Sequence, residues 1–511
     1  MKNTYYVTSP IYYVNDVPHI GHAYTTLACD VLARFMRLDG REVKFLTGTD
    51  EHGQKVEKSA EKAGLLPQAF TDQVSQRFRE LFSTMNISND DFIRTTEERH
   101  KKAAQSLWNK LIASGNIYLS KYSGWYSVRD EAFYNESELI EGGLAPTGAP
   151  VEWVEEPSYF FKLSAWQDKL LELYENNPGF IKPESRRNEV ISFVKGGLTD
   201  LSVSRTSFKW GVPVPGDESH VMYVWLDALT NYISALGYPD EEAEEFKKFW
   251  PADVHIMGKD ITRFHAVYWP AFLMAAGLEV PKSIMAHGWW TNEGQKISKS
   301  VGNVIDPFKL IEEFGLDQTR YFLMREVIFG NDGNYARANM INRINSELAN
   351  NIGNLVQRTL SFVAKNAEGK VPEVSAAFVE EAYKGGLLEL ASVWREKAQV
   401  YMDDQNYNAV LDEIIKLASQ ANIFIDHEAP WNLRKTDLGR MNEVLYVLLE
   451  TIRYIGITLQ PFIPESASKI LDSLAISQGE RSFATLSKRY ALRPGIKLPT
   501  PEPIFPRYQE A

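Results

Sequence analysis

Two short stretches of the sequence hold the residues best suited to chemistry, and the first is PHIGHAYTT at residues 18–26. His19 and His22 stand three positions apart around Gly21, where a strand-like segment gives way to a helix-like one. Free N–H groups at a helix start favour an anion, so two imidazole donors beside them suit a phosphate. Gly21 would let a flat nucleotide base approach the backbone. The alternative is that both histidines are ordinary surface or capping residues.

The second stretch is GQKISKSVGN at residues 294–303, which places Lys296 and Lys299 in a polar loop with glycine on both sides. Two lysines on mobile hinges can close on a polyphosphate and neutralise the charge that develops when a phosphorus atom is attacked. A solvated basic turn is the alternative interpretation of this stretch.

Both stretches need a framework, and hydrophobic periodicity indicates a parallel sheet. Residues 4–14 and 42–53 are strand-like and end in polar loops, while residues 22–38 between them carry apolar positions at helical spacing. Strand, helix and strand at this spacing predict a right-handed βαβ unit, whose ligands bind at the carboxyl ends of the strands. We therefore expect the histidine pair and the loop around Asp50 at that edge of the sheet.

The same alternation returns at residues 254–261 and 283–290, after a segment rich in Tyr, Trp, Gly and Pro, so the sheet is split in sequence. Residues 335–480 keep helical spacing almost throughout. The predicted fold class is α/β: a split Rossmann-like parallel-sheet catalytic domain with an inserted connective domain, followed by an all-α helical bundle. The expected domains are 1–116, first half of the Rossmann domain; 117–222, the insertion; 223–334, its second half with the lysine loop; 335–482, the bundle; and 483–511, an extended Pro-rich tail.

Composition sets further bounds. The chain has 511 residues, 44% of them hydrophobic, which suits several cores rather than one. Its one cysteine, Cys29, excludes a disulfide framework and fits a reducing compartment, so we expect a cytoplasmic protein. No apolar run is long enough for a membrane span. A net charge of −12 argues against non-specific coating of nucleic acid but allows a local basic face.

Taken together, the two stretches resemble the HIGH and KMSKS signatures of class I aminoacyl-tRNA synthetases. The first is present letter for letter, and the second reads KISKS, with Ile in the Met position. Five further stretches resemble, in order, the methionyl-tRNA synthetase family: SPIYYVNDVPHIGH, FLTGTDEHGQK, YVWLDAL, MGKDITRFHAVYWPAFL and ELANNIGNLVQR. The resemblance implies ATP-dependent ligation of L-methionine to methionine tRNA through methionyl-adenylate, with release of AMP and pyrophosphate.

The resemblance also implies the residues of each site. The catalytic set is His19, His22, Lys296 and Lys299, and the ATP set adds Gly21, Asp260 on the ribose, His287 and Gly288. Magnesium would accompany ATP, with no ligands named. The methionine set is Ile11, Tyr13, Trp225, Ala228, Tyr232, Ile261, His265 and Trp269, with Asp50 facing the substrate ammonium. An apolar, aromatic slot suits a thioether, although core packing alone would also explain each aromatic residue.

In the helical region the resemblance implies that Asn354, Arg358 and Trp431 read the anticodon. Asn354 and Arg358 lie four apart and share a helix face. A tryptophan platform beside amide and guanidinium donors suits the unstacked bases of an RNA loop. Without the resemblance, Trp431 would be taken for a core residue.

The sequence departs from the family in the inserted domain. Many members carry a zinc knuckle with four cysteines, whereas this chain has Ser127, Asp130, Leu144 and Thr147 at those positions. No thiolate is left to hold zinc. We therefore expect a metal-free knuckle packed by its own aromatic residues, Trp125, Tyr126 and Trp153, and no zinc in the protein. A monomer is expected because no dimerisation domain is appended.

Four alternatives stay open at this point. A synthetase for another apolar amino acid would usually carry an editing insertion, for which residues 117–226 look too short. A small-molecule adenylyltransferase would not need the large helical region. A non-catalytic RNA-binding or scaffolding protein would be favoured by loss of a signature histidine or lysine, and all four are present. Asp50, Glu51 and His52 could suggest a metal site, but consecutive residues rarely all face one ion.

Overall fold

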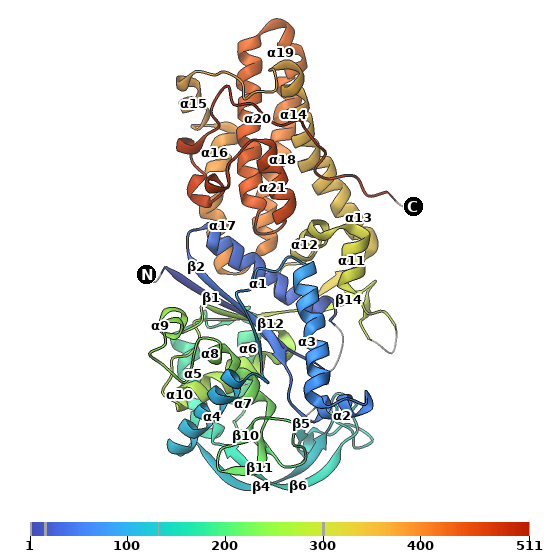
Figure 1. Cartoon of the computed structure of the whole chain (residues 1–511), viewed down its shortest axis with the longest axis vertical. Helices are drawn as coiled ribbons and strands as arrows, with labels where there is room; N and C mark the ends of the chain where they lie inside the picture. Colours follow the sequence, from blue (N-terminus) through green and yellow to red (C-terminus); the bar gives the residue numbers. More distant parts are fainter. Residues whose placement is uncertain (1–2, 15–17, 131, 299–301, 510–511) are drawn as a thin grey trace. The chain divides into compact units, whose positions relative to one another are not determined.

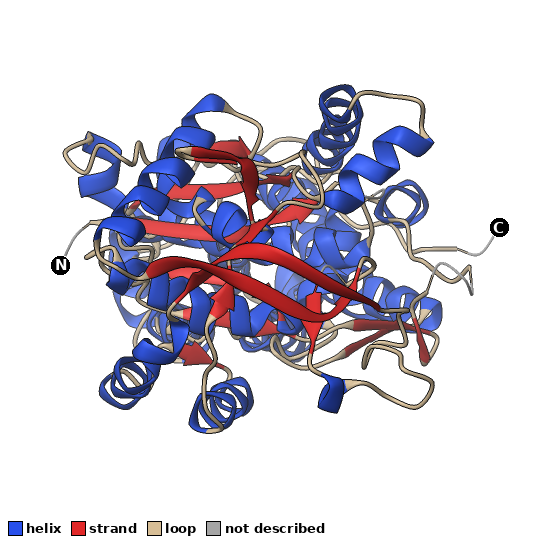
Figure 2. Ribbon diagram, turned by 90° about the horizontal axis from the view of Figure 1, so that it is seen from below, coloured by secondary structure: helices blue, strands red, loops and turns tan. Residues whose placement is uncertain are grey.

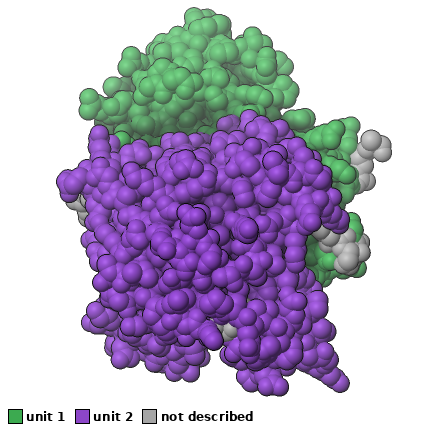
Figure 3. Space-filling view, turned by 60° about the horizontal axis from the view of Figure 1, so that its bottom comes forward, with its two compact units in different colours: residues 1, 30–43, 288–511 green, residues 2–29, 44–287 purple. Residues whose placement is uncertain are grey.

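The structure is a computed structural model, and it describes residues 3–14, 18–130, 132–298 and 302–509. The chain divides into two compact units, coloured separately in Figure 3. Unit 1 comprises residues 1, 30–43 and 288–511, and unit 2 comprises residues 2–29 and 44–287. None of the described helices is both long and apolar enough to cross a membrane.

A mostly parallel sheet forms the centre of unit 2 and holds six strands among the described residues. Their order is β3 (Asp91–Arg94), β2 (Glu42–Asp50), β1 (Thr4–Tyr13), β12 (Val254–Gly258), β13 (Ile284–His287) and β7 (Ile181–Lys182). The β2–β3, β1–β12, β12–β13 and β13–β7 pairs are parallel. Strands from both ends of the unit therefore share one sheet, as the split alternation predicts, and the fold-class prediction is confirmed.

Helices alternate with the strands of this sheet along the chain, and Figure 2 colours helices blue and strands red. The helices are α1 (Ile20–Leu38), α2 (Gln54–Lys62), α3 (Pro67–Thr84), α4 (Glu98–Ala113), α5 (Gln167–Asn176), α6 (Glu184–Lys195), α7 (Val224–Leu229), α8 (Asn231–Ser234), α9 (Glu244–Phe249) and α10 (Trp269–Ala275). One buried cluster joins Leu46 and Ile284 of the sheet to Leu107 of α4 and Phe272 of α10. Burial of each such side chain contributes about 1.5–3 kcal/mol.

The inserted segment forms two small sheets of its own. One has the order β5 (Ala132–Tyr134), β4 (Ile117–Ser127), β6 (Glu152–Phe161) and β8 (Leu201–Ser202), and the other has the order β10 (Pro213–Val214), β11 (Asp217–Met222) and β9 (Ser204–Arg205). Long antiparallel pairing of β4 with β6 gives this segment its main ladder.

Unit 1 is mainly helical. Its strands are β14 (Trp290–Asn292), β15 (Gln295–Lys296) and β16 (Gly333–Tyr335). Its helices are α11 (Pro307–Phe314), α12 (Leu316–Arg325), α13 (Arg337–Arg343), α14 (Asn354–Asn366), α15 (Ala376–Ala382), α16 (Gly386–Ser392), α17 (Trp394–Asp403), α18 (Tyr407–Glu428), α19 (Pro430–Thr436), α20 (Leu438–Leu459) and α21 (Pro464–Ser473). Helix α20 is buried along most of its length and packs against α18 and α21 (Figure 1). This is the bundle that the helical spacing predicts.

Two local features differ from the expectations. One strand of the sheet, the edge strand β3 at Asp91–Arg94, is not among the strands that the sequence predicts. A run of four residues is too short for its period to be distinguished from a helix. The tail contains two 3₁₀ turns, Phe483–Thr485 and Lys488–Tyr490, before it becomes irregular. Two of the predicted domains, 1–116 and 223–334, contain residues of both units, and the predicted domain boundaries stay a prediction.

Candidate active site

The two histidines of the first stretch stand at the start of α1. His19 precedes the helix, and its ring lies on that of His22 with 3.8 Å between ring centroids. The Nδ1 atom of His22 accepts a hydrogen bond from the backbone N–H of His19 at 3.1 Å, and Nδ1 of His19 accepts one from the N–H of Gly21 at 3.1 Å. A Cβ atom on residue 21 would lie 2.9 Å from the His19 ring, so the stacked pair requires glycine there.

These hydrogen bonds determine the chemistry of both rings. Burial lowers the pKa of His19, an effect that the negative charge of Asp260 opposes. Burial, followed by the neighbouring His19, lowers the pKa of His22 well below its ordinary value. Each ring is therefore neutral near pH 7, and because Nδ1 is an acceptor, the proton is on Nε2. The pair offers two uncharged N–H donors.

Aromatic side chains hold His22 in place. The ring of Tyr12 meets the His22 ring edge-on at 4.9 Å, and Phe78 of α3 meets it at 5.1 Å. Tyr12 stacks on Phe78 at 5.5 Å, and its hydroxyl lies 2.6 Å from Oγ1 of Thr26. The sequence prediction named Tyr13 and missed Tyr12, although the alternation of side chains along a strand places them on opposite faces of β1.

The ends of β12 and β13 meet next to each other, since Gly258 pairs with His287. Asp260 follows β12 and is exposed, while His287 ends β13 and is buried. Thr25 of α1 donates a hydrogen bond to the carbonyl of Gly21 at 3.0 Å. Because its single proton is used there, Nε2 of His287 donates to the Thr25 oxygen at 2.7 Å. His287 thus supports the first turn of α1.

Gly288 and the lysine loop belong to unit 1. A Cβ atom on Gly288 would lie 2.4 Å from the backbone of Asn331, so close packing explains this glycine without a ligand. Lys296 is exposed on β15, which pairs with β14. Asn303 bridges the base of the loop, accepting from the N–H of Ser298 at 2.8 Å and donating to the carbonyl of Lys296 at 3.1 Å. Lys299 lies outside the described residues.

Most of the predicted methionine set belongs to, or packs against, one buried cluster of unit 2. Tyr232 and Trp269 belong to the buried cluster, and the half-buried Ile11, Trp225 and Ile261 pack against it. Ala228 is buried one residue before the end of α7, and Tyr13 is half-buried at the end of β1. Trp225 also stacks on Phe264 at 3.5 Å.

His265 is hydrogen bonded on both ring nitrogens. Nδ1 lies 3.0 Å from the carbonyl of Ile261 and Nε2 lies 2.7 Å from the hydroxyl of Tyr232. Burial lowers the pKa of His265 to about 4, so the ring is neutral, donates from Nδ1 and accepts from Tyr232. His265 lies in a π-helical turn, Phe264–Tyr268, a local irregularity that is frequent at functional sites.

The acidic loop after β2 divides its side chains between different partners. Asp50 is buried at the last position of the strand, and its carbonyl accepts from the N–H of Val14 at 3.1 Å. Glu51 forms a bidentate pair with Arg94 at 2.7 and 2.9 Å. His52 bonds instead to Asp227 at 2.6 Å. Glu51 and His52 are thus bound elsewhere, and the described residues contain no group of three His, Cys, Asp or Glu side chains that could hold a metal.

The inserted knuckle is closed by hydrogen bonds between the positions where cysteines would fall. Asp130 accepts from the hydroxyl of Thr147 and from that of Tyr134, the latter at 3.1 Å, while its backbone N–H donates to Oγ of Ser127 at 3.2 Å. Trp125 meets Trp153 edge-on at 5.3 Å. Polar and aromatic contacts therefore hold this segment.

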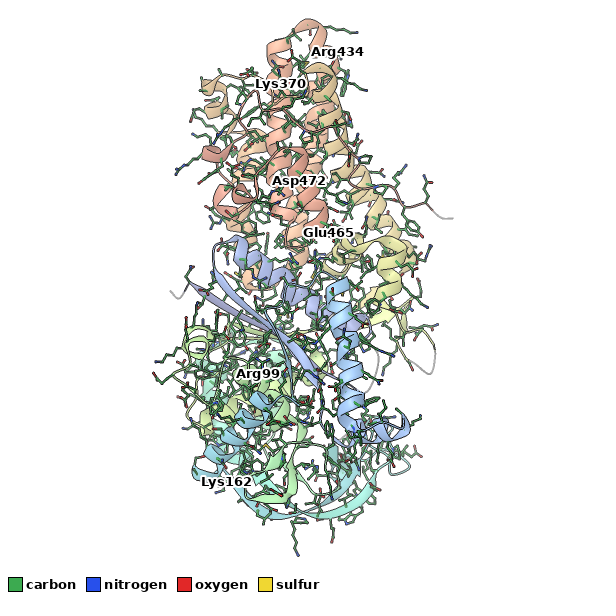
Figure 4. All side chains as sticks on the ribbon, in the orientation of Figure 1. Arg99, Lys162, Lys370, Arg434, Glu465 and Asp472 are labelled. Atoms are coloured by element: carbon green, nitrogen blue, oxygen red, sulfur yellow. The ribbon has the colours of Figure 1, made fainter. Side chains whose placement is uncertain are left out.

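The predicted RNA-reading residues lie in the helical region of unit 1. Asn354 and Arg358 are on α14, which follows a π-helical segment, Ile344–Gly353. The guanidinium carbon of Arg358 lies 5.7 Å from the Trp431 ring, and Arg358 also pairs with Asp426 at 2.6 Å. Trp431 is 38% exposed on α19, the helix that carries Arg434, labelled in Figure 4. The arrangement presents an aromatic face beside cationic groups.

Comparisons with known proteins agree over the whole chain. The family model described as tRNA synthetases class I (M) matches residues 5–149 and 137–360, and the one described as the anticodon binding domain of methionyl tRNA ligase matches residues 371–511. The chain is 65% identical to a methionine–tRNA ligase of Rickettsia felis, over 100% of this chain and 99% of that protein. It is 57% identical to one of Brucella suis, with coverage of 100% and 99%.

A solved structure is similar as well. The Mycobacterium tuberculosis methionyl-tRNA synthetase in complex with methionyl-adenylate is 52% identical and superposes with a TM-score of 0.94, over 99% of this chain and 100% of that chain.

Proposed function

The chain belongs to the methionyl-tRNA synthetases, a family of class I aminoacyl-tRNA synthetases, and from that premise we propose a role for each group of its site. The protein is an ATP-dependent ligase that joins L-methionine to methionine tRNA through methionyl-adenylate, releasing AMP and pyrophosphate. The sequence-based prediction of family and activity is confirmed. The proposals concern the residues.

The histidine pair binds the phosphates of ATP. The observation that supports this role is that both Nδ1 atoms accept from the backbone, which leaves two neutral Nε2–H donors at the start of a helix. In the first step the methionine carboxylate attacks the α-phosphorus, the bond to the bridging oxygen breaks, and pyrophosphate leaves with the electron pair. Neutral donors stabilise the charge on the reacting phosphate without repelling other cations.

Lys296 and Lys299 neutralise the leaving pyrophosphate, and Asn303 holds the carbonyl of the first lysine. Asp260 accepts hydrogen bonds from the ribose hydroxyls. ATP enters with Mg²⁺, which usually keeps several waters and binds substrate phosphates with few protein ligands. When bound, the ion adds positive charge along the phosphates. The exposed Asp260 carboxylate suits a ribose or a hydrated ion, and no set of protein ligands is assigned.

The methionine side chain enters the slot around Tyr232, and Asp50 pairs with the substrate ammonium. Tyr232 directs its proton to His265, so the slot presents aromatic carbon rather than an open hydroxyl to the thioether. A buried carboxylate against an ammonium forms a charge-assisted hydrogen bond, which is strong out of water. The two ends together select an amino acid with a flexible, uncharged side chain.

Pyrophosphate exchange into ATP, measured with each of the twenty standard amino acids in turn, tests the adenylation site. Exchange with methionine and with no other amino acid is expected, because the apolar, aromatic slot suits a flexible thioether. Exchange with another apolar amino acid at a similar kcat/KM would contradict the proposed pocket, and exchange with none would contradict the histidine and lysine roles.

Trp431→Ala tests the RNA-reading role separately. Loss of one base-stacking platform costs about 1–3 kcal/mol, so kcat/KM for aminoacylation of methionine tRNA should fall by roughly 5- to 150-fold. Methionine-dependent pyrophosphate exchange, which needs no tRNA, should stay within about twofold. Exchange that falls in parallel with aminoacylation would show that Trp431 acts on the fold instead. Leu438→Ala, which alters an exposed side chain on the neighbouring helix α20, is the matched control.

We further propose a monomer that acts in the cytoplasm, where one buried cysteine is no liability. Light scattering on the purified protein tests the first point. A mass of 58.2 kDa is expected, and twice that mass would contradict it.

A further inference from the structure

A fully buried carboxylate in unit 2 holds two histidines, and none of the three has a part in the chemistry described above. Asp227 accepts from Nδ1 of His52 at 2.6 Å and from Nε2 of His100 at 2.7 Å. Nδ1 of His100 lies 3.0 Å from Oγ of Ser234. Asp227 and His100 have no exposed surface, and His52 is 3% exposed.

The cluster joins three parts of the chain that are far apart in sequence. His52 lies two residues after Asp50, the proposed partner of the ammonium. Asp227 lies on α7 between Trp225 and Ala228, which belong to the proposed methionine slot. His100 is on α4, and its contact with Ser234 reaches α8, the helix of Tyr232. One carboxylate therefore connects the chain neighbours of both ends of the proposed methionine site.

The loop that carries His52 is braced on its other side by Trp210. The indole N–H of Trp210 donates to the carbonyl of Glu51 at 2.5 Å, and the N–H of Gly53 donates to the carbonyl of Trp210 at 2.9 Å. The Trp210 ring meets the His52 ring edge-on at 5.6 Å. His52 is thus held between Trp210 and Asp227.

The charge of Asp227 determines which groups of the cluster donate hydrogen bonds. Burial raises the pKa of Asp227, but the charges and hydrogen bonds of His52 and His100 outweigh it and hold the pKa at about 2. The group is therefore a carboxylate near pH 7, and both histidines must donate to it. A buried ion of this kind is often no more stabilising than well-packed apolar residues, and its best-attested role is to specify one arrangement of the elements it joins.

We propose that Asp227, with His52 and His100, is a positioning group that fixes the separation between the ammonium-binding Asp50 and the side-chain slot around Tyr232. It thereby sets the length of amino acid that the enzyme accepts. The inference rests on the proposed function of those two ends, and it adds that discrimination by chain length depends on residues that touch no substrate.

The kinetics of pyrophosphate exchange with three amino acids test the inference. They are methionine, homocysteine, which lacks the terminal methyl group of methionine, and ethionine, which has one methylene more than methionine. Such a difference of one carbon is worth roughly 10- to 200-fold in kcat/KM in a well-fitted pocket. Asp227→Asn can accept from one histidine and presents an amide N–H to the other. We expect the methionine KM to rise by about tenfold or more, the ATP KM to stay within about twofold, and the preference over both analogues to fall by about fivefold or more.

A second pair of variants covers the case in which Asp227→Asn does not fold. His100→Gln keeps an N–H donor near the position of Nε2, and His100→Ala removes it. His100→Ala should raise the methionine KM as Asp227→Asn does. For His100→Gln, the rise in the logarithm of the methionine KM should be at most half as large. Circular dichroism and the urea midpoint show that each variant is folded.

Glu450→Gln is the matched control, because Glu450 is a fully buried carboxylate in unit 1 bonded to Arg453 and Tyr383. It should lower stability and leave the methionine KM and the analogue preferences unchanged.

Two results would overturn the inference. One is that folded Asp227 and His100 variants keep the methionine KM and both analogue preferences within twofold of the wild type. The other is that methionine and ATP KM values rise together, as a general loosening of the fold would cause. Exchange by the wild-type enzyme distinguishes failure of the inference from failure of the proposed function. If the wild type does not exchange with methionine, the proposed function fails, whereas a normal wild type with unaltered variants contradicts the positioning role alone.

Discussion

At the scale of single residues, the structure explains why the first signature has two histidines rather than two lysines. His19 and His22 donate from Nε2 without a charge, because the backbone occupies Nδ1 and burial lowers both pKa values. A lysine in either place would bring a point charge and would have no acceptor for the backbone N–H. The signature therefore encodes donor geometry as well as polarity.

Replacing His22 should separate these two contributions. His22→Ala removes one preorganised donor and should lower the rate of methionyl-adenylate formation on the order of 10²- to 10³-fold. His22→Gln, whose amide N–H reaches the position of Nε2–H, should recover part of the loss. Single-turnover adenylation measures both. A His22→Ala rate within about twofold of the wild type would show that His22 does not contact the reacting phosphate.

At the scale of elements, side-chain hydrogen bonds to Asp130 close the inserted knuckle. Asp130 gathers three hydrogen bonds from Thr147, Tyr134 and Arg129, whereas Leu144 offers no donor atom and pairs with Pro150 through its backbone. Arg129 also donates to the carbonyl of Thr147 at 2.6 Å. Side-chain hydrogen bonds thus close this loop.

We predict that the purified protein holds no stoichiometric zinc and that Asp130→Ala loosens the knuckle. The variant loses its bonds to Thr147 and Tyr134, so tryptic cleavage after the exposed Arg129 should speed up by about tenfold, equivalent to about 1.4 kcal/mol of local opening. Asp130→Asn can still accept a hydrogen bond from Thr147, so its cleavage rate should lie between those of the wild type and Asp130→Ala. Elemental analysis that finds one zinc per chain after gel filtration would contradict the metal-free knuckle.

At the scale of the whole molecule, buried neutral histidines make stability depend on pH. Burial lowers the pKa of His19, His22, His255 and His265, that of His265 to about 4. In the unfolded chain each titrates near its ordinary pKa of about 6.5. Below that value the unfolded state binds more protons than the folded state, so the free energy of unfolding falls as the pH falls. The contribution is complete above pH 6.5 and is lost toward about pH 4 for His265.

We therefore predict a lower urea midpoint at about pH 5.5 than at about pH 7.5, with a slope of up to about 1.4 kcal/mol per pH unit for each histidine that differs by a full proton. His255→Asn keeps a partner for Thr8, to which His255 Nδ1 is bonded at 2.7 Å, and removes one titrating group. Its midpoint should depend less on pH. A wild-type midpoint that is equal or higher at the lower pH would contradict the prediction.

The sequence by itself determined the fold class, the family and the activity. The period of apolar residues distinguishes the strands and helices of unit 2 from the bundle of unit 1, and a few contiguous residues carry each signature. Of the residues assigned to the methionine set, Tyr232 and Trp269 share one buried cluster, and His265 is hydrogen bonded to Tyr232. Lys299 lies outside the described residues, and close packing already explains Gly288.

Only the tertiary structure decided how these groups are oriented. Asp227 appears in the sequence as one letter of YVWLDAL, yet its partners His52 and His100 are 175 and 127 positions away. Likewise, the backbone N–H groups of His19 and Gly21 establish which nitrogen of each signature histidine carries the proton, and ring contacts from Tyr12 and Phe78 orient His22. Periodicity reports which face of an element is buried, whereas a hydrogen bond depends on the distance between atoms that the folded chain brings together. No sequence pattern predicts that distance, because it depends on how elements far apart in the chain pack against each other.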